Sequence, residues 1–522
     1  MTPPCFLLTF DGMKKTKGET ISGGLRSMML MVFLQFLVGG VGAQGFSNLY
    51  YDNRPSMMFG SIVPHGQNYY FTGTTTTNSG PPYYGKACFG KIRSDGMVDS
   101  IFGIIDTNQF GYENFNNTLK LITDGNFISV GSEIDSVPRV YFIKTDTADN
   151  ILLWQQYTEQ GVDLYHAQDV VEIPDGGYLI AINAHFISSN SQVIIIRTDL
   201  AGNVINKRTY GLAANEFPWV IRPMLNGHYM IGGFSGKTNS NTPYWAKTWL
   251  LEVDSMGNYI SQWLDTNTRN LWPRGMQQTA DSGWIIVRQH LSYDINDFQK
   301  YNASIVKYDN HFGIEWEQHL GDSSDVTGFY DVEILPDGKY IACGTTPIWG
   351  SDSAHRFGWI VKFDTDGTVI WDRKYVSYER FGTHSFLDDI DVLPNGDLLA
   401  CGELQFTFDV GITPLQQGWI LRTDSNGCEL SSCVTGISQS EIRHPKFAIF
   451  PNPASDQVFI ESATTTQGEL SIADELGRVL YTNPHFDGAT AIKVNNWMNG
   501  IYFYRLRTST NEQRSGKIVV QH

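Results

Sequence analysis

Short runs in which apolar and polar residues alternate recur along residues 59–433, separated by turns rich in Asp, Asn and Gly. In Asp169–Ala181, one such run lies on each side of a Pro-Asp-Gly-Gly turn. Alternation with a period of two around such turns is typical of antiparallel β-hairpins. The same pattern recurs at Leu119–Gly131, Val220–Gly233, Met276–Gln289, Asp331–Gly344 and Asp389–Gly402, with a weaker copy at Ile62–Gly73.

A second hairpin pattern alternates with the first. Its leading strand ends in Lys, Arg or Glu, then any residue, then Asp, and a Gly/Asn turn and a return strand follow, as in Val193–Ile205 and Gly358–Trp371. Lys91–Gly96 is a divergent first copy. Two hairpins per repeat predict seven units of four short strands. The marker Asp recurs at Asp146, Asp199, Asp254, Asp309, Asp364 and Asp424.

Seven repeats of four short strands, with no amphipathic helix between them, resemble a seven-bladed β-propeller, a ring that leaves few exposed strand edges. A pair of β-sandwiches is the alternative all-β arrangement, but the near-equal repeats favour the propeller over it. We expect residues 46–433 to form the propeller. The last unit lacks a good fourth strand, because Glu429–Ser432 is short and polar. Phe46–Tyr51 is expected to supply that strand and hide an edge.

Two of the four connections in each unit are long and dissimilar, and alternation of strand direction puts both on one face of the ring. Variable loops on a rigid scaffold usually carry binding residues, and aromatic and Arg side chains suit carbohydrate or protein surfaces. The alternative is that many of these rings pack between blades. The binding residues predicted on this face are Tyr83, Tyr84, Tyr244, Trp245, Trp272, Arg274, Trp349 and Arg380.

The sequence offers no clear catalytic, metal or cofactor motif. Gly80–Lys86 has the letters of a phosphate loop, but Ala87 follows where Ser or Thr is needed. Asp364–Gly367 and Asp424–Gly427 resemble pieces of a calcium loop without its remaining ligands, which favours ordinary turn roles for Asp and Asn. We therefore predict no catalytic residues, no bound metal and no cofactor.

Residues that recur at equivalent repeat positions indicate structural roles. Trp359 and Trp419 are expected to fill interfaces between blades, and Cys343 and Cys401 to be small buried apolar residues. Cys428 and Cys433 lie in a turn-rich tail and are predicted to form a disulfide.

The N-terminal residues 1–43 have the pattern of a secretory signal peptide. Four basic residues precede the apolar run Met28–Val38, and Val41–Ala43 offers a small-residue cleavage site. A buried N-terminal helix is the alternative. Residues 1–12 add nothing that a signal peptide needs, so Met13 is a candidate start. The formal charge of −17 excludes a nucleic-acid binder that works by neutralising phosphates.

The C-terminal block 445–522 differs from the rest of the chain. It has seven basic and seven acidic residues, so the negative charge lies elsewhere. A linker at 434–444 precedes it. Seven short strands in fewer than 80 residues imply a small immunoglobulin-like β-sandwich. Its landmarks are Phe450–Asp456, Asp474–Arg478, Asn499–Leu506 and Gly516–Val520.

These motifs, in this order, are similar to the type A C-terminal sorting domain of the type IX (Por) secretion system of Bacteroidetes. The resemblance implies export through the periplasm to the outer surface, with the outer-membrane translocon and a sortase-like surface protease as partners, and attachment to lipopolysaccharide as a further step. The residues that carry the motifs are Pro451, Asn452, Pro453, Asp474, Gly477, Arg478, Gly500, Tyr502 and Lys517.

For the propeller itself we expect a binding module for a glycan or a protein rather than an enzyme, because loop aromatics are present and a catalytic motif is not. A hydrolase or lyase acting on polysaccharide is one alternative, and it requires a carboxylate pair or a metal in the central channel. A structural surface protein is the other alternative.

Overall fold

The computed structural model describes residues 45–50, 56–76, 85–103, 118–133, 137–187, 190–212, 214–237, 245–265, 271–293, 299–321, 327–347, 356–376, 383–406, 416–429, 448–450, 454–461, 467–508 and 513–522. The chain is all-β, and these residues contain 35 strands and no helix. The predicted signal peptide (1–43) and linker (434–444) lie outside the described residues. Within the described ranges, no helix is long and apolar enough to cross a membrane.

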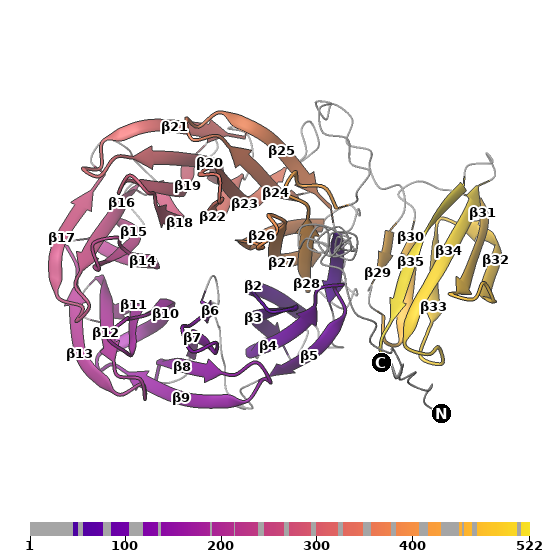
Figure 1. The fold of residues 1–522 in the computed structure, drawn as a ribbon, viewed down its shortest axis with the longest axis horizontal. Helices are drawn as coiled ribbons and strands as arrows, with labels where there is room; N and C mark the ends of the chain where they lie inside the picture. The colour runs from indigo at the N-terminus through magenta and orange to yellow at the C-terminus, as the bar shows by residue number, and fades with distance from the viewer. Residues whose placement is uncertain are drawn as a thin grey trace, which may run out of the picture. The chain divides into compact units, whose positions relative to one another are not determined.

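Residues 56–423 form repeating four-stranded antiparallel units arranged around a common axis (Figure 1). The first and innermost strands are β2 (Ser56–His65), β6 (Lys120–Leu121), β10 (Val162–Glu172), β14 (Asn215–Pro223), β18 (Leu271–Gln278), β22 (Gly328–Ile334) and β26 (Thr383–Val392). The second strands are β3 (Asn68–Thr76), β7 (Phe127–Glu133), β11 (Tyr178–Phe186), β15 (Tyr229–Lys237), β19 (Trp284–Tyr293), β23 (Tyr340–Pro347) and β27 (Leu398–Phe406). The third strands are β4 (Gly85–Arg93), β8 (Arg139–Thr145), β12 (Ser191–Thr198), β16 (Trp245–Val253), β20 (Gln299–Tyr308), β24 (Arg356–Phe363) and β28 (Gln416–Thr423). The outer strands are β5 (Val98–Gly103), β9 (Ile151–Thr158), β13 (Val204–Tyr210), β17 (Tyr259–Leu264), β21 (Ile314–Leu320), β25 (Val369–Tyr375) and, from the start of the chain, β1 (Phe46–Tyr50).

Four of these units are separate sheets, and three are joined into one twelve-stranded sheet. The joins are slight, because each consists of a single parallel bridge, Arg356 to His384 and Ser56 to Gln416. Pairing within each unit is antiparallel, as the hairpin patterns predict.

The predicted pairing of the chain's start with the last unit is confirmed. Strand β1 runs antiparallel to β28, with Phe46 opposite Arg422 and Tyr50 opposite Gly418. The side chain of Trp419 donates a hydrogen bond to Ser47 Oγ at 2.9 Å. Strand β1 therefore covers the edge that the last unit would otherwise expose.

A bulge recurs in the innermost strands and explains the glycine that ends the first hairpin pattern. The register shifts at Phe59/Ser61, Ala167/Asp169, Pro218/Val220, Pro273/Gly275, Phe329/Asp331 and Leu387/Asp389. A Cβ atom at the facing glycine of the second strand would overlap a backbone oxygen of the inner strand, which only glycine avoids. These glycines are Gly73, Gly233, Gly344 and Gly402.

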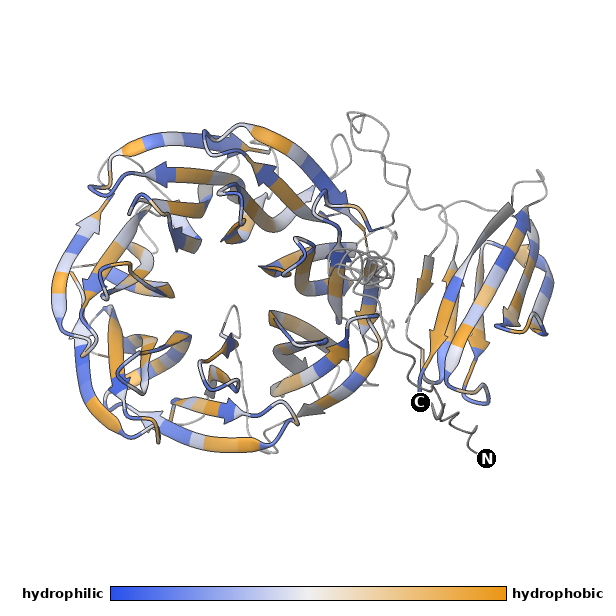
Figure 2. Ribbon diagram, in the orientation of Figure 1, coloured by the Kyte–Doolittle hydropathy of each residue, from blue (hydrophilic) through white to orange (hydrophobic). Residues whose placement is uncertain are grey.

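Both faces of the units are apolar and pack against neighbouring units, and Figure 2 shows hydrophobic and hydrophilic bands alternating along the strands. Trp359 and Trp419 are buried, and Trp419 lies against Gly358 of the preceding unit, as expected of side chains that fill interfaces. Cys343 and Cys401 are buried free thiols, which confirms their predicted role.

The marker Asp of the second hairpin stabilises its turn. In Asp199, one carboxylate oxygen accepts hydrogen bonds from the backbone N–H groups of Ala201 and Asn203, and the other accepts one from the Asn203 side chain at 3.0 Å. Asp424, in a segment that resembles a calcium loop, likewise accepts two backbone N–H groups, each at 2.8 Å. These contacts are the turn roles that the sequence favours.

The C-terminal region has two antiparallel sheets. One contains β29 (Ala448–Phe450), β30 (Gln457–Glu461) and β33 (Ala489–Lys493). The other contains β32 (Val479–Asp487), β31 (Gln467–Asp474), β34 (Gly500–Thr508) and β35 (Gln513–Val520). Apolar residues of both sheets share one core, among them Ile460 and Ile472.

Candidate functional site

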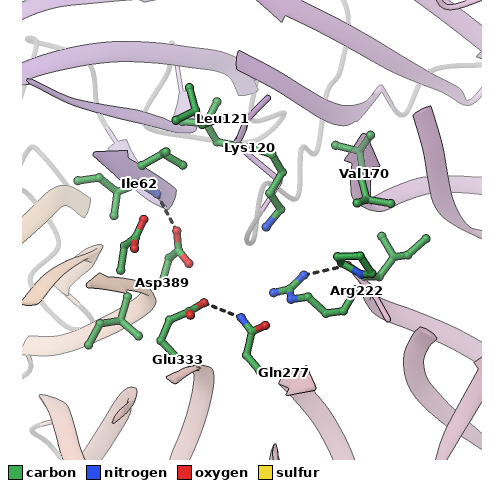
Figure 3. Close-up of a pocket in the computed structure, with 15 residues that line it drawn as sticks. Ile62, Lys120, Leu121, Val170, Arg222, Gln277, Glu333 and Asp389 are labelled. Carbon is green, nitrogen blue, oxygen red and sulfur yellow. Dashed lines mark hydrogen bonds between the residues drawn. The ribbon is translucent and has the colours of Figure 1, made fainter. Parts of the chain in front are cut away.

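A cavity of about 270 Å³ lies on the axis of the units and is lined by residues from all of the innermost strands (Figure 3). Much of its wall is apolar, as at Ile62, Val170 and Ile221. The polar residues that line it are Lys120, Arg222, Gln277, Glu333, Asp389 and Asp391.

Most of these polar residues share one position in the repeat. Arg222, Gln277, Glu333 and Asp391 each lie two residues beyond the end of the bulge in their strand, and each is paired with a residue near the start of the second strand. Lys120 has the same pairing in β6. The fold thus brings side chains from five units, far apart in the sequence, to one level of the axis.

The cationic side of the cavity is built around Asp169, which is buried behind it. Arg222 Nη1 lies 2.8 Å and Lys120 Nζ 3.7 Å from the Asp169 carboxylate. Burial opposes the charge on Arg222, but Asp169, Asp331 and Glu333 together raise the pKa of its guanidinium, so it stays charged. The same Asp169 carboxylate accepts the backbone N–H of Ile221 at 3.1 Å.

At the position just beyond the bulge, polar side chains of four inner strands connect their strand to the next one. Asp389 accepts the backbone N–H of Ile62 at 2.7 Å, and Ser61 accepts that of Leu119 at 3.3 Å. Asp331 accepts the N–H of Ile390 at 3.4 Å and is hydrogen-bonded to Asp389. Burial, followed by the charge of Asp389, raises the pKa of Asp331 well above its usual value. These carboxyl groups hold the ring together.

Glu333 and Asp391 form the acidic side of the cavity. Glu333 Oε1 accepts a hydrogen bond from Gln277 Nε2 at 2.6 Å, and Asp391 accepts one from the backbone of Val392 at 2.6 Å (Figure 3 shows the first). Burial, followed by the charge of Asp391, raises the pKa of Glu333 to about 7. Burial and the charge of Asp389 raise the pKa of Asp391 to about 6. Both groups therefore change charge close to neutral pH.

A second level of polar residues is formed by the bulged residues themselves. The Arg274 guanidinium lies 4.1 Å from the centre of the Trp219 ring and 5.9 Å from that of Tyr330, so neighbouring bulges contact one another. Asp388 occupies the next bulge, and burial and the charge of Glu403 raise its pKa well above the usual value. Burial also raises the pKa of Glu403 to about 7.

The structure describes only part of the binding face predicted from the sequence. Tyr83, Tyr84, Tyr244, Trp349 and Arg380 lie outside the described residues. The remaining three residues, Trp245, Trp272 and Arg274, lie within the described residues.

The prediction places Trp245, Trp272 and Arg274 in connections, whereas all three lie within strands. Trp245 is the first residue of β16, opposite Lys237. Trp272 and Arg274 belong to β18 because the inner strand begins before its bulge. Trp272 stacks on Phe234 with ring centres 5.3 Å apart, so it packs within the fold. Arg274 is the bulged residue of β18 and contacts Trp219, the bulged residue of β14.

Sequence reasoning missed the cavity residues. Lys120, Arg222, Gln277, Glu333 and Asp391 occupy a position at which other repeats carry Val63 and Val171. An alignment of the hairpin repeats on one another would have shown that this position is polar in five of the seven repeats.

The remaining predicted residues lie near the C-terminal end of the chain. Cys428 is disulfide-bonded, and its predicted partner Cys433 lies outside the described residues. So do Pro451, Asn452 and Pro453.

The Asp474–Arg478 motif forms the same kind of turn as the marker Asp. Asp474 accepts the backbone N–H groups of Leu476 and Arg478, and its other oxygen lies 2.7 Å from the Arg478 guanidinium. Gly477 has a φ of +79°, which favours glycine.

The later motif residues lie on the last two strands. Gly500 begins β34, and Tyr502, in the core, donates a hydrogen bond to the Met498 carbonyl at 2.7 Å. Lys517 lies on β35 opposite Phe503.

Residues 448–521 match the family described as secretion system C-terminal sorting domain. This match supports a cargo of the type IX system and points to export to the cell surface or the extracellular space. No curated protein matches this chain in sequence.

The solved structures named below are similar to this chain at TM-scores under 0.5. They include the β-propeller domain of the Trilobed protease from Pyrococcus furiosus, at 8% identity over 73% of this chain and 100% of that chain, with a TM-score of 0.38. Polysaccharide lyase Uly1 is 9% identical over 72% of this chain and 92% of that chain, with a TM-score of 0.43. An α-L-arabinanase from Penicillium chrysogenum is 10% identical over 59% of this chain and 92% of that chain, with a TM-score of 0.35. We draw no functional argument from these structures.

Proposed function

We propose that this chain is an exported binding protein in which a seven-bladed β-propeller carries the binding site. In this proposal residues 1–43 are the signal peptide, 46–433 the propeller, 434–444 a linker and 445–522 a type A sorting domain with an immunoglobulin-like sandwich fold. The sorting-domain match supports the route. Its partners are the outer-membrane translocon and a sortase-like protease, with lipopolysaccharide attachment as a further step.

The observation that carries the binding role is the axial cavity. Its wall combines apolar surface with hydrogen-bond donors from Lys120, Arg222 and Gln277 and acceptors from Glu333 and Asp391. A concave, pre-formed site with a few convergent polar groups is typical of small-ligand binding. Sugar hydroxyls both donate and accept hydrogen bonds, so we propose that the cavity receives a sugar residue of a glycan.

The test is binding of a glycan array by the mature protein, followed by calorimetric titration of the best sugar. Lys120→Met and Gln277→Ala are expected to weaken that binding at least tenfold. Lys339→Met changes a lysine in a turn between β22 and β23 and serves as the matched control, with affinity unchanged. Equal affinity in all three variants would contradict a site in the cavity, and absence of binding to every glycan would contradict the function.

A second candidate function, hydrolysis or lysis of a polysaccharide, is favoured by one observation. Glu333 and Asp391 have pKa values of about 7 and about 6, so one can hold a proton while the other is ionised, as a general acid and its partner require. Release of reducing sugar by the wild type, lost in Glu333→Gln and Asp391→Asn, would establish this function. Binding without product would leave the binding role as the better account.

A further inference from the structure

The charge of the cavity wall is unevenly distributed. Lys120 and Arg222 come from β6 and β14, whereas Glu333, Asp389 and Asp391 come from β22 and β26 (Figure 3 shows the two groups facing each other). Since both cations contact the Asp169 carboxylate, part of their charge is balanced within the protein. The opposite side retains an excess of carboxyl groups.

The carboxyl groups on that side are not equivalent. Asp389 accepts hydrogen bonds from the backbone N–H of Ile62 at 2.7 Å and from Ser61 Oγ at 3.1 Å. It is also hydrogen-bonded to Asp331. It therefore has a structural role between neighbouring inner strands.

Glu333 and Asp391 differ from Asp389 because the hydrogen bonds they accept come from neutral donors, the Gln277 amide and the Val392 backbone. The charges of Arg222 and Lys120 act on Glu333, and that of Lys120 acts on Asp391, but among the residues that the structure describes neither carboxyl group forms a salt bridge. A carboxylate removed from water is costly to ionise without a cationic partner. A cation entering the cavity would supply that partner and would gain from both groups.

We propose that Glu333 and Asp391 bind the ammonium group of an amino sugar, with the sugar ring filling the remainder of the cavity. The inference rests on the proposed function, because it specifies the ligand of the same site. An ammonium group is a compact charge with three hydrogen-bond donors, which suits two carboxylates that each have lone pairs to spare. The apolar wall and the donors of Gln277 and Lys120 suit the uncharged, hydroxyl-bearing part of such a ligand.

The experiment is calorimetric titration of the full mature protein at pH 7 with glucosamine, glucose and N-acetylglucosamine, which share a ring and differ in charge. Glucosamine is expected to bind at least tenfold more tightly than the two neutral sugars. Glu333→Gln and Asp391→Asn, which keep the shape of the side chains, are each expected to remove most of this preference for glucosamine over glucose. At pH 5, below the pKa values of about 7 for Glu333 and about 6 for Asp391, the preference is expected to weaken.

Each result that contradicts the proposal has its own consequence. Equal affinities for the three sugars would overturn the ammonium site and leave sugar binding intact, whereas no binding of any sugar would overturn the proposed function as well. A preference for glucosamine over glucose that persists in both Glu333→Gln and Asp391→Asn would overturn the inference. Calcium chloride or ethylammonium producing the same heat as glucosamine would show a general cation site and overturn the amino-sugar assignment.

Discussion

The pairing of β1 with β28 makes a quantitative prediction for Leu49→Ala. Leu49 is 5% exposed and packs in a cluster with Ile360, Leu404 and Leu421 of the last two units. Replacing a buried leucine with alanine costs about 2–5 kcal/mol, from lost apolar burial and the cavity left behind. Because β1 is a short strand at an edge, we expect this cost to appear first as local release of β1 rather than as global unfolding.

The assay is hydrogen exchange of the mature protein, followed on peptides that cover residues 45–50 and 416–423. A loss of about 3 kcal/mol in the free energy of β1 release corresponds to roughly 100-fold faster exchange in both peptides. Peptides from β10 to β13 should exchange at the wild-type rate, because these strands form a separate sheet.

Leu225→Ala is the matched control, because Leu225 is 70% exposed and loses the same atoms. We expect this variant to change stability by less than about 0.5 kcal/mol. If Leu49→Ala exchanged like Leu225→Ala in residues 416–423, the reasoning that β1 closes the last unit would be refuted.

Four further predictions follow from the structure. Gly344→Ala places a Cβ atom against the Gly328 carbonyl, so it should lower the melting temperature more than Gly338→Ala, which introduces only backbone strain at φ +81°. A calorimetric scan compares the two variants, and an equal effect would contradict the role of the bulge. Arg222→Met leaves Asp169 buried without its main cation and should cost about 3–5 kcal/mol in chemical denaturation; adding Asp169→Asn should recover part of that loss. Burial raises the pKa of Glu333 from 4.5 to about 7, so the folded state binds this proton more tightly than the unfolded chain and stability falls as pH rises from about 4.5 through 7; the melting temperature should be higher at pH 5 than at pH 8, and Glu333→Gln should reduce the difference. A chain ending at His444 should fold but stay in the periplasm of a host with type IX machinery, whereas normal surface levels in cell fractionation would contradict the role of the sorting domain.

The strands of this protein were predictable because their signal is local. Alternation and turn residues set each hairpin, and the weak outer strand of the last unit pointed to residues 46–51, of which 46–50 form β1. The glycine that ends each first hairpin was visible as a pattern. Its cause was not, because the close approach of Gly344 to the Gly328 carbonyl depends on a bulge that only the paired strands reveal.

The cavity was less predictable, because its residues come together only when the inner strands meet around an axis. Glu333 and Asp391 are 58 positions apart in the sequence, and each by itself looks like an ordinary polar residue in a strand. Aromatic residues drew the sequence prediction toward the connections, yet Trp272 packs on Phe234 within the fold. Side-chain type alone does not distinguish packing from binding; the position within the repeat does.

The pairing of β1 with β28 also determines the order of folding. Ser47 and Trp419, which are hydrogen-bonded, are 372 positions apart, so the last unit cannot be completed until nearly all of the repeating units have been made. In a chain that is synthesised and translocated from its N-terminus, β1 emerges first and waits for its partner longest. Contacts of such large sequence separation form slowly, and the edges of β1 and β28 are open to incorrect pairing until the two strands meet. Completion of the last unit is therefore the natural late step of maturation, and the stage at which the exported protein is most vulnerable to aggregation and proteolysis.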